Sequence, residues 1–359
     1  MRIREGLKYD FKDLLLVPQR SGVPSRANVE LSRKFTFPHS KRELVCIPLI
    51  AANMSTVGTF AMAKALAKCN ILTALHKYYS IEQLADFFLE NTGLWDCIFY
   101  TVGTSKEDYD KLITLKKIIA NKTDTATAES FPHLLCIDVA NGYTGNFIST
   151  VEVYRKTICS QSIILAGNVV TSNIAEELIL HGADIVKVGI GSGSVCTTRL
   201  KTGVGYPQLS AIAESSFVVH GKPNGHICSD GGIIHPGDVS KALAAGADFV
   251  MIGGGFAGTD ECEGDWELDS QGKRSHLKFF GMSSKDAQDQ FNGGLATHRS
   301  AEGKTVKVKY KGSISDVVID ILGGVRSTCT YVGAERIKDL PKCAEFIHVA
   351  RTHNNVFGE

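Results

Sequence analysis

The segment GIGSGSVCTTRLKTGVGYPQ, residues 189–208, places one cysteine inside a run of glycines. Cysteine is the strongest intrinsic nucleophile among side chains, provided that part of it is thiolate. Main-chain amides of the loop and the nearby Arg199 would favour the thiolate of Cys196, and the hydroxyls of Thr197 and Thr198 could move protons beside it. Two alternatives remain: a tight loop in which the cysteine only packs, and a loop whose carbonyls surround a monovalent cation.

The glycines of this loop do not fit a dinucleotide-binding motif. That motif, Gly-x-Gly-x-x-Gly, opens directly into a helix. Here Ser194 occupies the sixth position, and a cysteine and a basic stretch follow it. The pattern therefore favours a mounting for Cys196 over a cofactor-binding turn.

Two further glycine-rich loops carry groups that suit a nucleotide. Asp230 lies in SDGG, residues 229–232, where its carboxylate is placed to accept hydrogen bonds from ribose hydroxyls. Gly253, Gly254 and Gly255 offer bare main-chain amides to a phosphate. Each loop alone could be a helix cap or a turn, but together with the cysteine loop they favour a nucleotide site.

The elements around these loops predict an α/β protein. Short apolar, β-branched runs alternate along the chain with segments whose apolar residues have helical spacing. The apolar runs are 44–53, 71–75, 97–103, 134–140, 162–167, 184–191, 226–232 and 248–255, and the helical segments include 57–69, 80–90, 105–121, 171–181 and 236–245. This alternation indicates a parallel sheet covered by helices, and the strand number favours a closed (β/α)₈ TIM barrel of roughly 250 residues plus insertions. The three loops would then open on the C-terminal face, where such barrels keep their active sites.

An internal repeat supports the barrel. The segments GADIVKVGIG (182–191) and GADFVMIGGG (246–255) share a helix-ending glycine, an aspartate and an apolar strand that ends in glycines. We expect residues 1–359 to form a single catalytic domain, because no linker interrupts it. The polar segment 259–312 is expected to be an insertion, or flap, that folds over the active face, with a solvated loop at 259–275.

The charge and the apolar composition of the chain limit the classes of partner that it is expected to bind. Lys and Arg total 39 and Asp and Glu total 38, giving a net charge of +1, which disfavours a nucleic-acid or anionic-membrane surface. No apolar run approaches the roughly 20 residues that span a bilayer. The 10 cysteines are scattered without a Cys-x-x-Cys pair, which is typical of buried free thiols in a reducing, cytosolic (cytoplasmic) compartment.

With these residues in view, the chain resembles the GMP reductase branch of the IMP dehydrogenase and GMP reductase family along nearly its whole length. The resemblance is carried by segments such as AANMSTVGT, DVANGY, VKVGIGSGSVCTTR, GMSS, AEGKTV and ILGGVRSTCTYVGA. Three features favour the reductase: no regulatory insert follows the second strand, no Arg-Tyr pair lies between Met282 and Glu302, and AEGKTV looks like the reductase form. A dehydrogenase must hydrolyse its covalent intermediate, whereas a reductase must keep water away.

The resemblance implies the reductive deamination of GMP by NADPH, which gives IMP and ammonia. Cys196 would attack C2 of the purine to form a covalent thioimidate, and Thr198 and Glu302 would supply the proton for the departing ammonia. The implied substrate contacts are Asp230, Gly231, Gly232, Gly253, Gly254, Gly281, Met282, Ser283, Arg299, Ser300, Ala301 and Gly303.

The resemblance also implies a cofactor site, a potassium ion and a homotetramer. The implied NADPH contacts are Ser25, Arg26, Lys77, Asp138, Val139, Ala140, Ile190, Gly191, Met282, His298, Arg299, Ser327, Thr328, Cys329 and Thr330, several of them from a neighbouring subunit. Carbonyls of Gly191, Gly193, Cys196 and Arg199 would bind the potassium ion.

Two positions depart from the family pattern, and two other functions stay open. Ser55 stands where the family has aspartate and His298 where it has tyrosine, and both changes affect the cofactor side. The chain could instead be an IMP dehydrogenase without its regulatory insert. A nucleotide-binding barrel that senses purines without turning them over is the third possibility.

Overall fold

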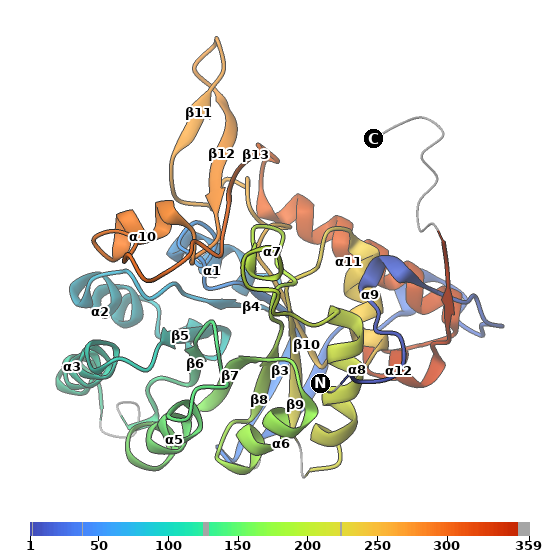
Figure 1. The fold of residues 1–359 in the computed structure, drawn as a ribbon, viewed down its shortest axis with the longest axis horizontal. Helices are drawn as coiled ribbons and strands as arrows, with labels where there is room; N and C mark the ends of the chain where they lie inside the picture. Colours follow the sequence, from blue (N-terminus) through green and yellow to red (C-terminus); the bar gives the residue numbers. More distant parts are fainter. Residues whose placement is uncertain (2, 38, 125–128, 223–224, 351–359) are drawn as a thin grey trace.

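The computed structural model describes residues 1–350 apart from residues 2, 38, 125–128 and 223–224. Its centre is a closed barrel of parallel strands, which confirms the expected fold (Figure 1). Strand β10 closes the ring by pairing with β3, Val250 opposite Leu49. The barrel strands are β3 (Arg42–Ala51), β4 (Ile71–Ala74), β5 (Ile98–Val102), β6 (Leu134–Asp138), β7 (Ile163–Val169), β8 (Ile185–Val188), β9 (His226–Asp230) and β10 (Phe249–Ile252).

Helices cover the outside of the barrel, and several begin where a hydroxyl caps the first turn. The side chains of Thr59, Ser80 and Ser105 each accept a main-chain N–H at the start of a helix. The five expected helices are present as α1 (Phe60–Ala67), α2 (Ile81–Glu90), α3 (Lys106–Lys122), α6 (Ser172–Leu180) and α9 (Pro236–Ala244). The structure adds α5 (Phe147–Val153), continued by the π-turn Tyr154–Ile158, then α8 (Gln208–Val219), α11 (Ile314–Val332) and α12 (Leu340–Cys343).

The internal repeat has a structural reason. Gly182 and Gly246 end α6 and α9 with φ of +108° and +107°, a backbone region that favours glycine. The side chain of the aspartate two residues later accepts a hydrogen bond from the preceding strand of the barrel. Asp184 accepts a hydrogen bond from the N–H of Ile164 at 2.9 Å, and Asp248 accepts one from Ile227 at 2.9 Å. Each repeat therefore ties together the N-terminal ends of adjacent strands.

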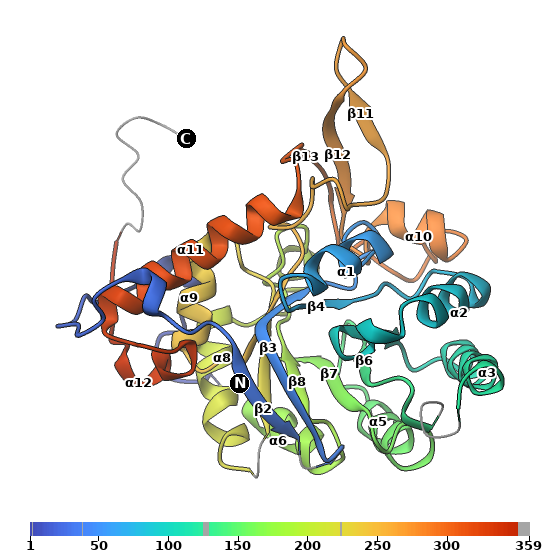
Figure 2. The same ribbon diagram turned by 180° about the vertical axis from the view of Figure 1, so that it is seen from behind.

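The N-terminal ends of the barrel strands, which we call the floor, are closed by a hairpin that the sequence analysis did not predict (Figure 2). Strand β2 (Arg33–Phe37) runs antiparallel to β3, with Arg33 opposite Cys46. Its buried rings, Phe35 and Phe37, join the core inside the barrel, and Phe35 stacks on Phe249 with ring centroids 4.3 Å apart. The floor is therefore plugged by aromatic side chains.

Short elements join the two ends of the chain beside α11. Strand β1 (Leu14–Leu16) pairs antiparallel with β14 (Phe346–His348). The turns of 3₁₀ helix are Phe11–Asp13, Arg26–Asn28, Thr92–Cys97 and Ile337–Asp339. Among the helices of the described residues, none combines the length and the apolar composition needed to cross a membrane.

The insertion at 259–312 projects from the opposite end of the barrel, which we call the mouth (Figure 1). It contains β11 (Trp266–Leu268), β12 (Arg274–Phe280), α10 (Lys285–Phe291) and β13 (Thr305–Lys309), and its strands form an antiparallel sheet in the order β11-β12-β13. The segment 259–275, expected to be a solvated loop, is largely exposed, but it contains β11 and the start of β12, so the expectation of a loop was wrong there. Trp266 pairs with Leu277 across the hairpin, and the Arg274 guanidinium lies 4.6 Å from the Trp266 ring centroid, so cross-strand contacts order this polar segment.

Candidate active site

A cavity of about 350 Å³ opens at the mouth of the barrel. The loops after β8, β9 and β10 all line it, as the sequence analysis expected from their positions at the strand ends. Residues from these loops that face the cavity are Gly189, Ile190, Gly191, Ser192, Gly193, Ser194, Val195, Cys196, Thr198, Asp230, Gly231, Gly232, Ile233, Gly253 and Gly254.

Cys196 stands in a loop whose glycines allow close approach of its two sides. Gly191 has a φ of +79°, and a Cβ there would lie 2.6 Å from Cγ of Arg199. The N–H of Cys196 donates to the carbonyl of Gly193 at 3.0 Å. Directly after the cysteine, helix α7 (Thr198–Thr202) begins. The glycines therefore fold the loop back so that Cys196 faces the cavity.

The sulfur of Cys196 begins a short series of hydrogen bonds. The thiol donates to Oγ1 of Thr198 at 3.2 Å, and the Thr198 hydroxyl donates to Oε2 of Glu302 at 2.8 Å. All three side chains line the same cavity. A thiol, a hydroxyl and a carboxylate joined in this way can pass a proton from the sulfur to the carboxylate.

Glu302 comes from the insertion, more than a hundred residues from Cys196, and main-chain bonds hold it in place. Its carbonyl accepts the N–H of Thr197 at 2.8 Å, and its N–H donates to the carbonyl of Ser283 at 3.1 Å. The next bond on the same segment runs from the N–H of Lys304 to the carbonyl of Val195 at 2.9 Å. Two of these bonds, at Glu302 and at Lys304, fasten the insertion to the cysteine loop.

Arg199 makes contacts that the sequence did not predict, and its effect on the thiolate of Cys196 stays a prediction. Its guanidinium makes two hydrogen bonds to the Asp10 carboxylate, at 2.8 and 3.2 Å, and a third to the carbonyl of Tyr206 at 2.6 Å. The hydrogen bond with Asp10 raises the pKa of Arg199. The guanidinium therefore anchors the N-terminal segment against the loop, and its attraction to Cys196 also contributes to the raised pKa of Arg199.

A buried lysine that the sequence analysis missed lies beneath the cavity. Lys187 on β8 is 3% exposed, and its Nζ lies 2.7 Å from Oδ1 of Asp138 and 2.8 Å from Oδ2 of Asp230. Although burial opposes its charge, the two carboxylates raise the pKa of Lys187 well above its usual value. Burial likewise opposes ionisation of Asp138, but Lys187 outweighs it and lowers the pKa of that carboxyl. The only sequence signal was a charge inside the apolar run DIVKVGIG.

Glycines after β9 and β10 allow these two loops to pack closely against the cysteine loop. Gly231 has a φ of +88°, and a Cβ there would lie 2.5 Å from Oγ of Ser192. A Cβ on Gly254 would lie 2.8 Å from Oγ of Ser194. These two hydroxyls line the cavity and were not among the expected site residues, although both belong to the quoted cysteine loop.

The structure also brings Tyr78 to the cavity, which the sequence analysis did not single out. Its ring stacks on Phe291 of α10, with centroids 3.9 Å apart and planes 18° from parallel. Burial raises the pKa of Tyr78 to about 12, so its hydroxyl stays protonated at neutral pH. This stack is a second link between the barrel and the insertion.

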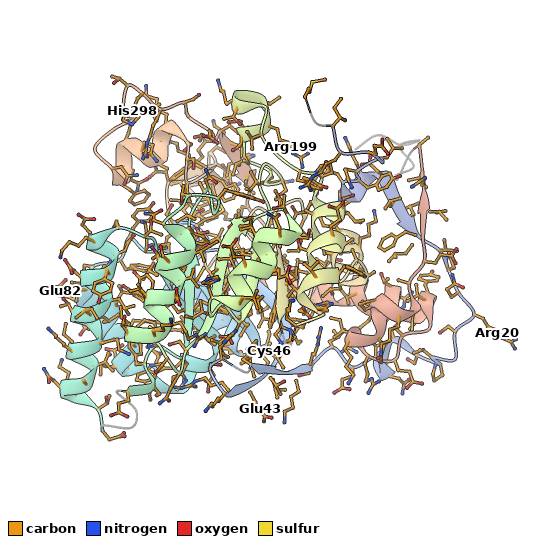
Figure 3. The ribbon with its side chains drawn as sticks, turned by 60° about the horizontal axis from the view of Figure 1, so that its bottom comes forward. Arg20, Glu43, Cys46, Glu82, Arg199 and His298 are labelled. Atoms are coloured by element: carbon orange, nitrogen blue, oxygen red, sulfur yellow. The ribbon has the colours of Figure 1, made fainter. Side chains whose placement is uncertain are left out.

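The expected substrate contacts divide into two groups. Asp230, Gly231, Gly232, Gly253, Gly254, Gly281, Met282 and Ser283 line the cavity. Gly303 pairs with Cys196 as an isolated bridge, and the carbonyl of Ala301 accepts the Thr197 hydroxyl at 3.4 Å. Arg299 and Ser300 are exposed on the insertion. Figure 3 shows their neighbour His298 on the side of the molecule away from Glu43 and Cys46.

The expected cofactor contacts also divide. Lys77, Asp138, Val139, Ala140, Ile190, Gly191 and Met282 line the cavity, and Ser55, one of the two departures, donates to Sδ of Met282 at 3.8 Å. A second set (Ser25, Arg26 and Ser327, Thr328, Cys329 and Thr330) lies where the 3₁₀ turn Arg26–Asn28 packs on α11. There Arg326 donates to the carbonyl of Arg26 at 3.2 Å. None of this second set lines the cavity among the described residues.

The expected potassium ligands are main-chain carbonyls of one loop. Those of Gly193 and Arg199 already accept hydrogen bonds, from Cys196 at 3.0 Å and from Gly203 at 3.2 Å. Each carbonyl oxygen has a second lone pair, so these hydrogen bonds leave both carbonyls able to accept a further contact, and the potassium site stays a prediction. Within the described part of the chain, no cluster of three or more His, Cys, Asp or Glu side chains is arranged to hold a metal.

Comparison with known proteins agrees with this geometry. A family model described as the IMP dehydrogenase / GMP reductase domain matches residues 8–355. A GMP reductase of Yersinia enterocolitica is 52% identical over 359 residues, covering 100% of this chain and 99% of the relative. GMP reductases of Yersinia pestis and Yersinia pseudotuberculosis match with the same identity and coverage. The chain therefore belongs to the IMP dehydrogenase / GMP reductase family and is an enzyme of the oxidoreductase class.

Proposed function

We propose that this enzyme reduces GMP to IMP and ammonia with NADPH, through a covalent thioimidate on Cys196. The observation that carries the proposal is the hydrogen-bonded series Cys196–Thr198–Glu302, with steps of 3.2 and 2.8 Å, inside the cavity at the mouth of the barrel. The full-length similarity to proteins named GMP reductase supports the same substrate.

The first step is an attack of sulfur on C2 of the guanine ring. As the S–C2 bond forms, the π electron pair of C2=N3 moves to N3, and the thiol proton passes to the Thr198 hydroxyl, which releases its own proton to Glu302. The C2–N bond to the 2-amino group then breaks, and protonated Glu302 returns a proton through Thr198 so that the amine leaves as ammonia. General acid–base help of this kind typically contributes about 10²–10⁴-fold to a rate.

The second step reduces C2 and frees the sulfur. NADPH, when bound, supplies the hydride to C2. The C2–S bond breaks and its electron pair returns to Cys196 as thiolate, which leaves IMP. A proton from solvent then restores the thiol for the next turnover. Lys77 and Asp138 would bind the nicotinamide side: both line the cavity, and Lys77 is held there by an ion pair with Asp108 at 2.9 Å.

The rest of the site positions the nucleotide. Asp230 would accept from the ribose hydroxyls, and the amides of Gly232, Gly253 and Gly254 would face the phosphate. Met282 and Ser283 from the insertion would contact the base. The carbonyls of Gly191, Gly193, Cys196 and Arg199 would hold a potassium ion that keeps the cysteine loop in shape.

A homotetramer accounts for the cofactor contacts that lie outside the cavity. The 3₁₀ turn Arg26–Asn28 contacts α11, which carries Ser327–Thr330, so a neighbouring subunit that presents this surface to the mouth would complete the NADPH site. A symmetric oligomer of identical chains is the usual way to build such a shared site. The cytosol is the expected compartment.

The choice of a reductase over a dehydrogenase rests on the fate of the thioimidate. Hydrolysis needs a water-activating pair, and the segment between Met282 and Glu302 holds no Arg-Tyr. A reductase has to keep water from C2, and the insertion fastened over the cysteine loop provides a cover for this purpose.

The test is an assay of purified enzyme with GMP and NADPH, with and without K⁺. The proposal expects the absorbance of the reduced nicotinamide to fall while IMP and ammonia appear in equal amounts. NADH formation from IMP and NAD⁺ would instead identify a dehydrogenase. GMP binding without any turnover would identify a purine-sensing barrel.

A further inference from the structure

Lys187 is a buried charge that the reaction above does not use. It lies on β8, and its ammonium reaches carboxylates at the ends of two other strands, Asp138 on β6 at 2.7 Å and Asp230 on β9 at 2.8 Å. Strand β7 separates β6 from β8 in the sheet. One ammonium therefore joins the two sides of the cavity through the barrel interior.

Two asparagine side chains complete the arrangement. Asn53 donates to Oδ2 of Asp138 at 2.8 Å, and Asn168 donates to Oδ2 of Asp230 at 2.8 Å. Asn168 also donates to the carbonyl of Gly189, at 2.7 Å. These hydrogen bonds hold both carboxylates in place. The four side chains that make them all border the cavity: Asn53, Asn168, Asp138 and Asp230.

The other titratable groups around Lys187 do not neutralise the pair of carboxylates. Cys136 and Cys228 face it from β6 and β9, and burial raises the pKa of both thiols, so they stay neutral at neutral pH. The charge of Lys77 acts on Asp138 from the cavity side. The carboxylates of Asp138 and Asp230 thus share the ammonium of Lys187.

We propose that Lys187 is a positioning residue that couples the ribose-side carboxylate Asp230 to the cofactor-side carboxylate Asp138, so that nucleotide binding depends on a residue on the cofactor side. This inference rests on the proposed function, which assigns the two carboxylates to the ribose and to the cofactor. A shared ammonium divides its attraction between its partners. When one partner loses its charge, the ammonium pairs more closely with the other, which is then less free to accept a ribose hydroxyl.

The experiment measures GMP binding by titration calorimetry with no cofactor present. Asp138→Asn keeps the shape of the side chain but removes the charge that competes for Lys187. We expect this variant to bind GMP at least about fivefold more weakly than the wild type. The matched control is Asp108→Asn, because Asp108 pairs with Lys77 at 2.9 Å on the same side of the cavity; it should bind GMP within about twofold of the wild type.

A double-mutant cycle shows whether Lys187 carries the coupling. Lys187→Met should also weaken GMP binding, and the double variant Asp138→Asn with Lys187→Met should bind no more weakly than the worse single variant. Fully additive losses would overturn the proposal, because a merely structural lysine would not make the two changes interdependent. If Lys187→Met does not fold, GMP binding by Asp138→Asn equal to that of the wild type still overturns the proposal.

The outcomes separate this inference from the proposed function. A wild type that binds no GMP overturns the proposed function and this inference with it. A wild type that binds GMP, together with an Asp138→Asn variant that binds it equally well, overturns only the coupling through Lys187.

Discussion

Asp248 at the floor of the barrel and Asp230 at its mouth both stand at an end of a barrel strand, but their surroundings differ. Asp248 is 2% exposed and receives Arg33 at 2.7 Å, His220 at 2.7 Å and the N–H of Ile227 at 2.9 Å. Burial opposes its charge, yet the hydrogen bonds from the histidines and the charge of Arg33 lower the pKa of Asp248 well below its usual value.

The side chain of Asp230 is 21% exposed and borders a cavity. Its contacts with Lys187 and Asn168 are both made to Oδ2. A carboxylate that its own chain pairs on both oxygens stabilises the fold. One that is fixed through a single oxygen beside a cavity is placed to bind a ligand. We therefore expect the floor of the barrel to serve stability and the mouth to serve ligand binding.

The largest effect is expected at Cys196, on the mouth side. Cys196→Ala removes the nucleophile, so GMP reduction should fall by at least about 10⁴-fold. The free energy of unfolding should stay within about 1 kcal/mol of the wild type. Steady-state kinetics and urea denaturation check the two halves of this prediction. Near-normal turnover in the alanine variant would remove the sulfur from the mechanism.

Glu302→Gln should have the next largest effect. The amide keeps the size of the side chain but cannot take the proton that Thr198 passes on, so kcat should fall about 10²–10⁴-fold. Glu267→Gln is the control, because Glu267 lies on β11 of the same insertion and pairs only with exposed Lys307 among the contacts described. An equal loss in both variants would mean that the insertion, rather than the Glu302 carboxylate, sets the rate.

At the floor we expect a substitution of Asp248 to lower stability rather than activity. Asp248→Asn leaves Arg33 and His220 without their buried counter-ion, which should lower the free energy of unfolding by about 3–5 kcal/mol. Activity per folded molecule should not change. Glu43→Gln, which breaks an exposed ion pair with Lys34 on the floor hairpin, should cost no more than about 1 kcal/mol. A change in KM for GMP in Asp248→Asn would contradict the separation of the two ends.

The smallest effect is expected from His220, whose side chain is 43% exposed. The hydrogen bond with Asp248 raises the pKa of His220 above the unfolded value of about 6.5. The protonated pair therefore stabilises the fold fully below that pH and contributes less as the pH rises through the folded-state pKa. We expect His220→Gln to cost up to about 1 kcal/mol near pH 6 and less near pH 8.5, measured by urea unfolding. A cost that grows with pH would contradict this assignment.

Local patterns in the sequence were enough to predict the barrel and the position of the cysteine loop at its mouth. The apolar runs gave every barrel strand, and Cys196, Thr198 and Asp230 lie together as their positions at strand ends required. Lys187 could not be assigned in this way, because its partners are on β6 and β9, and their pairing depends on barrel geometry rather than on spacing along one strand.

Two other features depended on contacts that the sequence pattern does not reveal. The hairpin at β11 and β12 reads as a polar loop because its order comes from cross-strand pairs such as Trp266 with Leu277. The guanidinium of Arg199 is close to Cys196 along the chain but pairs with Asp10 from the far N-terminal end. In both cases the deciding partner is distant in sequence.

The most direct measurement is mass spectrometry of enzyme quenched with acid during turnover of GMP with NADPH. The account predicts a peptide that contains Cys196 and carries the mass of a purine nucleotide lacking its 2-amino group, and the Cys196→Ala enzyme should give none. Rapid IMP formation with an unmodified Cys196 peptide at every quench time, or an adduct on another residue, would contradict it.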